Sequence, residues 1–169
     1  MIRIMQLPDV PRVAEIHVFG WRAAYRGIVT DEFLFNEMLV SKRISVFDNS
    51  VHNNTEETYV FDDGIIRSFL TIGTCRDSDK PDCFELWGIY VDPFMQRQGI
   101  GSKMVRFCEE RAVERGFKAI CLWVLEGNKN ARGFYEKLGY LPDGSGKFIE
   151  LFGAAEIRYS KNLGARISG

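Results

Sequence analysis

The segment 85–102, ELWGIYVDPFMQRQGIGS, joins an apolar stretch and a turn to a glycine-rich loop that opens a helix. A strand, a glycine loop and a helix in this order leave unpaired backbone N–H groups at the positive end of the helix, which favours a phosphate site. No Gly-Lys-Ser/Thr follows the glycines, and Gly99-Ile100-Gly101 lacks the third glycine of a dinucleotide-binding fingerprint. The sequence therefore predicts a ligand with a diphosphate of another kind.

Length and charge predict one domain, 1–169, without a strongly charged partner. A chain of 169 residues suits a single core. Its 22 Lys and Arg residues nearly balance its 23 Asp and Glu residues, so neither nucleic acid nor an anionic membrane is expected as a partner. The apolar run 119–125 is too short to span a bilayer, and the N-terminus shows no leader pattern. Four cysteines without C-x-x-C spacing favour free thiols in the cytoplasm over a zinc site, so no metal is expected.

Patterning predicts an α+β domain with a mixed sheet. Strands are expected at 1–6, 58–62, 65–75, from 85, at 117–125, near 140 and at 154–160. Helices are expected from Asp9 to about Ala24, over 31–39 with a continuation through 41–48, from the glycine loop to Gly116, and from Asn128 to Gly139. Asp63-Gly64 is typical of a two-residue hairpin turn, and the charged loop 76–82 is expected to be mobile.

Two motifs resemble the hallmarks of the GNAT superfamily of N-acetyltransferases. Segment 96–101, QRQGIG, matches the Q/R-x-x-G-x-G/A signature. The second hallmark matches Leu122, Val124, Asn128, Ala131, Phe134, Tyr135, Glu136, Lys137, Gly139 and Tyr140. The closing Ile157-Arg158-Tyr159 is similar to the last strand of that fold, so the resemblance covers essentially the whole chain. It implies a twisted sheet of six to seven strands with splayed central strands and about four helices.

The resemblance implies acetyl-CoA as cosubstrate. In such a site the pyrophosphate lies on the amides of the glycine loop, and the pantetheine arm pairs with the preceding strand, with a bulge at Gly88. The residues expected to contact acetyl-CoA are Ile89, Tyr90, Val91, Arg97, Gln98, Gly99, Ile100, Gly101, Ser102, Asn128 and Tyr135. Candidates for the adenosine phosphate are Arg97, Lys103, Lys129 and Arg132.

The same resemblance implies direct transfer of an acetyl group to an amine. Tyr135 is the expected general acid, because a phenol with a pKa of about 10 stays protonated when a thiolate departs. Glu85, eleven residues before Gln96, is the expected general base. Val91 is expected to supply the N–H for the oxyanion. Trp123 stands five residues before Asn128, where members that acetylate the N-termini of ribosomal proteins carry their base, which disfavours that acceptor.

A small-molecule amine is the expected acceptor. Trp21 and Tyr25 are expected to line its cleft by cation–π contact, although packing between helices explains both nearly as well. Acidic loops could attract a cationic amine; their members are Asp31, Glu32, Asp77 and Asp79. His17 and His52 are expected on a helix surface and in a loop, without a catalytic role.

The residues leave other functions and the oligomeric state open. A protein N-terminus or lysine is the alternative acceptor within the same chemistry. A non-catalytic CoA-binding sensor and a domain that binds another nucleotide diphosphate are alternatives from other classes. A homodimer is common among related folds and stays open.

Overall fold

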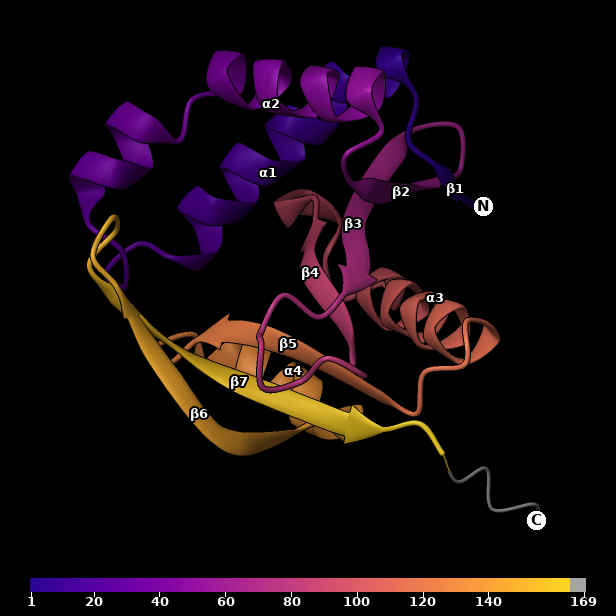
Figure 1. Cartoon of the computed structure of the whole chain (residues 1–169). Coiled ribbons are helices and arrows are strands. Elements are labelled where there is room, and N and C mark those ends of the chain that lie inside the picture. Colours follow the sequence, from indigo (N-terminus) through magenta and orange to yellow (C-terminus); the bar gives the residue numbers. More distant parts are fainter. Residues whose placement is uncertain (165–169) are drawn as a thin grey trace.

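The chain folds around a seven-stranded mixed sheet with the strand order β1-β2-β3-β4-β5-β7-β6 (Figure 1). A computed structural model describes residues 1–164; the end of the predicted domain, 165–169, lies outside the described residues. The strands are β1 (Ile2–Ile4), β2 (Glu57–Asp62), β3 (Ile66–Thr74), β4 (Phe84–Val91), β5 (Ala119–Leu125), β6 (Leu141–Ile149) and β7 (Ala154–Asn162). The main helices are α1 (Val10–Ala24), α2 (Val40–Asn53), α3 (Ile100–Glu114) and α4 (Lys129–Lys137).

Strand pairing confirms the predicted α+β class. Strands β1 to β4 pair antiparallel with their sequence neighbours. Helix α3 connects β4 to β5, and these two strands pair parallel. A parallel pair needs a crossover connection of this kind, because the chain must return to the end of the sheet at which the first strand began. Strand β7 then lies antiparallel between β5 and β6.

The two pairs of helices cover opposite faces of the sheet, as side chains alternate between faces along each strand. On β3, Phe69 packs in a cluster with α1 and α2. Its neighbour Leu70 packs in the larger cluster with α3, α4 and Tyr159 of β7. Figure 1 shows α1 and α2 above the β1–β4 half of the sheet, while β5, β7 and β6 diverge from that half.

Local sequence signals explain several of the boundaries. The hairpin between β2 and β3 turns through Asp63-Gly64, but Asp62 pairs with Ile66, so the loop has three residues and not the predicted two. Gly64 lies at φ 104°, and the side chain of Asp62 accepts a hydrogen bond from the Gly64 amide. Helix α3 ends before Gly116, whose φ of 84° is the left-handed conformation that ends many helices.

The predicted helix over 31–39 is wrong in part. The chain is helical from Asp31 to Glu37, with π-helical bonding over Phe33–Glu37. This helix ends before Leu39, which adopts an extended backbone with φ −106° and ψ 138°. Helix α2 begins afresh after it and is longer than predicted, so His52 lies in a helix and not in a loop. Most of β6 was also missed, since its Pro and Gly residues hide the strand pattern and its pairing with β7 is irregular.

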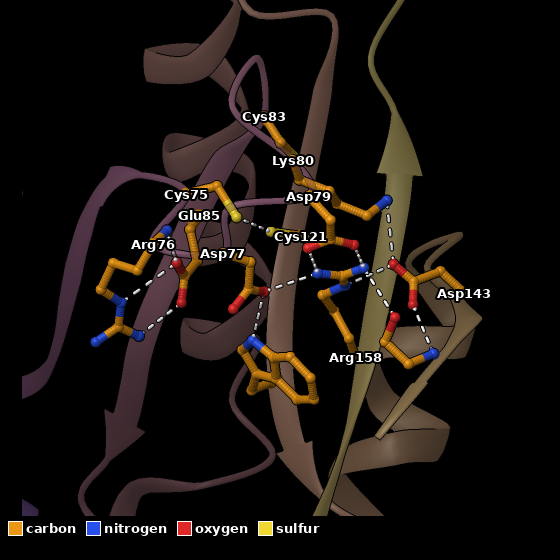
Figure 2. A network of polar contacts seen from close by, with 12 residues as sticks. Cys75, Arg76, Asp77, Asp79, Lys80, Cys83, Glu85, Cys121, Asp143 and Arg158 are labelled. Carbon is orange, nitrogen blue, oxygen red and sulfur yellow. Dashed lines mark hydrogen bonds and ion pairs between the residues drawn. The ribbon is translucent and has the colours of Figure 1, made fainter. Parts of the chain in front are cut away.

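Loop 76–82 is fixed to the sheet by Arg158 of β7, contrary to the predicted mobility (Figure 2). Arg158 is only 3 % exposed. Its guanidinium binds Asp77 at 2.8 Å, Asp79 at 2.6 Å and Asp143 at 2.7 Å. Because these carboxylates already neutralise a buried cation, Asp77 and Asp79 do not form the free acidic surface expected from the sequence.

We expect Arg158→Met to lower the free energy of unfolding by about 3 kcal/mol, because it leaves Asp77 and Asp79 without their cation and Asp143 with Lys80 alone. Urea denaturation at neutral pH measures this change. Arg111→Met is the control, since Arg111 pairs with the half-exposed Glu114 and lies over the Phe107 ring, apolar packing that Met can keep, and should change stability by about 0.5 kcal/mol or less. Equal effects of the two substitutions would contradict a structural role for the Arg158 cluster.

Wild type and Arg158→Met should differ less in their free energy of unfolding at acid pH. The hydrogen bond that Asp79 accepts from Arg158 lowers the pKa of Asp79. A lowered pKa contributes stability above the pKa of an unfolded aspartate, about 4, and that contribution is lost as the pH falls through the lowered value. The stability gap between wild type and Arg158→Met should therefore narrow below that pH.

Candidate active site

The sheet opens between its two central parallel strands. Strands β4 and β5 pair only from Phe84 with Ile120 to Leu86 with Leu122. Beyond these pairs, the described register between the two strands ends, although β4 continues to Val91 and β5 to Leu125. The result is a wedge between the strands, next to the glycine loop that follows β4.

A bulge in β4 lies at the start of the wedge, next to the predicted Gly88. Thr71 pairs with Gly88 and Ile72 with Leu86, so Trp87 is the extra residue. Just after the C-terminal end of β4, Asp92 donates its N–H to the carbonyl of Arg67 on β3.

That bond fixes which way the β4 backbone faces. Backbone groups alternate along an antiparallel strand, so Tyr90, like Asp92, directs its groups toward β3. Its carbonyl also accepts a hydrogen bond from the Ser68 hydroxyl. Ile89 and Val91 therefore direct their N–H and C=O groups into the wedge.

One cavity of about 640 Å³ runs from the glycine loop through this wedge. It brings together most of the residues that the sequence assigned to the site, namely Trp21, Tyr25, Ile89, Tyr90, Val91, Arg97, Gly99, Ile100, Gly101, Ser102, Asn128 and Tyr135. Two assigned residues, Gln98 and Glu85, are not among its lining residues. The side chain of Gln98 instead lies near the sulfur of Met95.

The glycine loop presents a row of backbone amides. Arg97 and Gly99 both have positive φ, 62° and 77°, and α3 makes its first backbone bond from Lys103 to Gly99. The amides before Lys103 therefore have no partner within the helix. At Gly101 a Cβ atom would lie 3.3 Å from the ring of Phe134, so glycine is needed there for α3 and α4 to approach closely. This cradle fits a diphosphate group.

Helix α4 places Asn128 and Tyr135 on the opposite wall of the cavity. Asn128 caps the helix by accepting a hydrogen bond from the Ala131 amide. Tyr135 lies one and a half turns into the helix and is 8 % exposed, with its ring 5.2 Å from that of Phe134. Burial raises the pKa of Tyr135, so its hydroxyl carries a proton at neutral pH.

Glu85 lies beside Arg76 (Figure 2). It is not among the residues that line the cavity. The carboxylate is 1 % exposed. One oxygen lies 2.6 Å from Nη2 of Arg76, and the other accepts from the Arg76 backbone amide at 2.9 Å. Both oxygens are thus occupied, and a bound amine can reach Glu85 only if Arg76 moves.

An aromatic wall closes the α1 side of the cavity. Trp21 donates its indole N–H to the hydroxyl of Tyr90 at 2.9 Å, and its ring lies 4.8 Å from that of Tyr25. Burial, followed by the neighbouring Tyr90, raises the pKa of Tyr25. These side chains line the cavity and pack on one another; their cation–π contact with an amine stays a prediction.

His17 belongs to the same packing and not to the helix surface expected from the sequence. Its ring centroid lies 4.6 Å from that of Tyr90 and 5.6 Å from that of Phe69. Burial, with a smaller effect of Arg43, lowers the pKa of His17 to about 3, so the ring is neutral at physiological pH.

Sequence reasoning missed the residues at the far end of the cavity. Arg76, Trp87, Trp123, Lys147 and Glu156 line it there. Lys147 and Glu156 are cross-strand partners on β6 and β7, with 3.6 Å between ammonium and carboxylate. No sequence signal paired them, because most of β6 was not predicted. Burial raises the pKa of Glu156, although Lys147 and Arg76 lower it.

The cysteines are free thiols among the described residues. The sulfur atoms of Cys75 and Cys121 lie 3.4 Å apart beside Glu85 (Figure 2). Within residues 1–164 there is no cluster of three or more His, Cys, Asp or Glu side chains suited to a metal ion. Over the same residues, no helix combines the length and the apolar character needed to cross a membrane.

Comparison with known proteins identifies relatives of the chain. A family model described as the acetyltransferase (GNAT) family matches residues 30–140. A probable N-acetyltransferase of Mycobacterium tuberculosis is 31 % identical over 147 residues, which cover 85 % of this chain and 80 % of the relative.

Solved structures share the fold at low sequence identity. The PaiA N-acetyltransferase of Thermoplasma acidophilum, in complex with coenzyme A, has a TM-score of 0.78 at 17 % identity, over 96 % of this chain and 98 % of that one. A putative acetyltransferase of Salmonella typhimurium, yncA, with its cofactor acetyl-CoA, has a TM-score of 0.65 at 15 % identity, over 100 % and 96 % of the two chains.

We expect Gly99→Val to weaken acetyl-CoA binding at least about tenfold, because the new side chain would stand between the loop amides and a phosphate. Calorimetric titration measures the Kd. Gly116→Val is a matched control: both glycines have φ near 80° and open space around the missing Cβ, so both variants carry a similar backbone penalty. Normal acetyl-CoA affinity in a folded Gly99→Val protein would rule out the loop as the phosphate site.

Proposed function

The chain belongs to the acetyltransferase (GNAT) family and is an N-acetyltransferase; on that premise we propose that it moves an acetyl group from acetyl-CoA directly to a primary amine of a small molecule. The observation that carries the proposal is the single cavity that joins the glycine loop, the open edge of β4 and Tyr135. The coenzyme A and acetyl-CoA in the neighbouring structures support this choice of cosubstrate.

The proposed cosubstrate site uses the backbone more than side chains. The amides of Arg97, Gly99 and the first turn of α3 would hold the pyrophosphate. Ile89 and Val91 would pair with the pantetheine amides as an added strand does. The Asn128 oxygen is used by its helix cap, which leaves the side-chain NH₂ to donate to the same arm.

The adenosine phosphate needs a cation near the loop. Of the candidates, Arg97 lines the cavity. Arg132 instead donates to the Tyr159 hydroxyl and to the Glu126 carbonyl. We therefore propose Arg97 for this phosphate.

When bound, acetyl-CoA supplies the thioester that carries the acetyl group. The N–H of Val91 faces the wedge and would donate to the thioester oxygen. Tyr135 would protonate the departing sulfur, because its phenol still carries its proton at neutral pH and can pass it to the thiolate as the C–S bond breaks.

The amine must lose a proton before it attacks, and two carboxylates are candidates for the base. Glu85, predicted from the sequence, is covered by Arg76. Glu156 lines the cavity, and its raised pKa makes it a better proton acceptor than an ordinary glutamate. Between the two, the geometry favours Glu156.

Amine-dependent release of CoA tests the proposal. Purified protein is mixed with acetyl-CoA, a thiol-reactive dye and a panel of amines from amino acids and polyamines to aminoglycosides and short peptides. Release with a small amine supports the proposal. Release with peptides alone would assign a protein acceptor, and normal acetyl-CoA binding without any release would assign a non-catalytic sensor.

We expect Tyr135→Phe to lower kcat about 100-fold, because the proton donor is lost, and to leave the Kd for acetyl-CoA nearly unchanged. Steady-state kinetics and calorimetry separate the two effects. Tyr140→Phe is the control: Tyr140 is also buried, but its hydroxyl binds Glu109, so its loss should reduce stability and spare kcat. An unchanged kcat in Tyr135→Phe would remove this residue as the acid.

We expect Glu156→Gln to lower kcat/KM at least about tenfold. With wild type, kcat/KM should rise with pH through a pKa above that of an ordinary glutamate, since the base must be ionised. This rising limb of the pH profile should be absent in Glu156→Gln. Glu85→Gln should keep the limb. The reverse pattern would restore Glu85 as the base.

A further inference from the structure

The far end of the cavity, formed by Arg76, Lys147 and Glu156, carries both signs of charge. All three side chains line it. We propose that this end binds an amine that also bears a carboxylate, with Glu156 facing the ammonium group and Lys147 and Arg76 facing the carboxylate. This inference rests on the proposed acetyl transfer and names the class of its acceptor.

The cations there keep donors for a ligand. Two of the five N–H groups of the Arg76 guanidinium, on Nε and Nη2, bind Glu85, while the side chain is 56 % exposed. The Lys147 side chain is 42 % exposed, and its single carboxylate neighbour, Glu156, is 3.6 Å away, which is longer than a good charge-assisted hydrogen bond.

Two tryptophans hold these cations in place. The Lys147 ammonium lies 3.8 Å from the ring centre of Trp123, and the Arg76 guanidinium lies 4.6 Å from that of Trp87. Trp123 is itself oriented by a hydrogen bond from its indole to Asp77, in the cluster that Arg158 anchors. A carboxylate between the two cations would be bound beside apolar ring faces, where ion pairs are stronger than in bulk water.

The same charges disfavour a polyamine. A second ammonium would meet Lys147 and Arg76, and like charges at short range repel. The carboxylates that could have attracted it are occupied, since Asp77 and Asp79 bind Arg158 and Glu85 binds Arg76. Glu156 alone remains within the described cavity, which is enough for the one ammonium of the reacting amine.

Matched pairs of acceptors test the inference. Glycine, β-alanine and lysine are each compared with their carboxamides, and lysine also with its decarboxylated diamine. Rates are expressed per concentration of neutral amine, because amidation lowers the pKa of a nearby ammonium. We expect kcat/KM to be about tenfold or more higher for the best acid than for its amide, the effect of one charge-assisted contact.

In the variant Lys147→Met, the ratio of kcat/KM for the acid to kcat/KM for its amide should fall toward one, because the substitution removes a cation that the amide does not need. Lys118→Met is the control: it removes the same charge from an exposed lysine before β5, outside the described cavity lining, and should keep the wild-type ratio. Arg76 is unsuited to this test, since its loss would leave the buried Glu85 without its cation.

Binding in the presence of CoA is measured in parallel by calorimetry, so that the inference does not depend on turnover. If the acids bind more tightly than their amides, and Lys147→Met abolishes this difference, the inference is supported even without acetyl transfer. In that case the proposed function fails and the inference stands. Equal or better use and binding of amides and diamines would overturn the inference while the transferase stands.

Discussion

The parting of β4 from β5 after Leu86 and Leu122 is the constraint on which the site depends. Two parallel strands that stayed paired to their ends would use the backbone groups of Ile89 and Val91 within the sheet. Because the strands diverge, these groups face a cavity, where an unpaired buried peptide group is costly and a ligand with amides of its own is favoured. The glycine loop follows β4 after Asp92 and the short 3-10 turn Pro93–Met95, so the backbone groups of β4 and the loop amides lie along one path for a long ligand.

Packing on both walls keeps the wedge open. On one side Trp21 of α1 donates a hydrogen bond to Tyr90 of β4. On the other side Gly101 allows Phe134 to approach α3 closely. The buried Arg158 holds the loop that carries Arg76. The walls of the cavity are therefore packed against their neighbours by aromatic rings and a charge cluster before any ligand binds.

Sequence reasoning predicted the half of the site that lies on contiguous segments. The glycine loop and the Asn128 to Tyr135 helix each follow an apolar strand, so local patterns were enough, and the mixed sheet followed from the order of these elements. The far end of the cavity, around Lys147 and Glu156, could not be predicted in this way. Glu156 and Lys147 are brought together by the pairing of β7 with β6, a strand whose pattern is interrupted by Pro142 and Gly144. The partner of Glu85 is Arg76, which was assigned to a mobile loop. The partner of Asp77 is Arg158 of the last strand.

Amide hydrogen exchange with and without acetyl-CoA tests the central claim, that the wedge and the glycine loop form one binding groove. The account predicts protection at Ile89 and Val91 together with Arg97 to Ser102, whereas ADP should protect the loop alone, because it lacks the pantetheine arm. Protection by acetyl-CoA that is confined to the loop, with the amides of β4 unchanged, would contradict the account and leave only a diphosphate site.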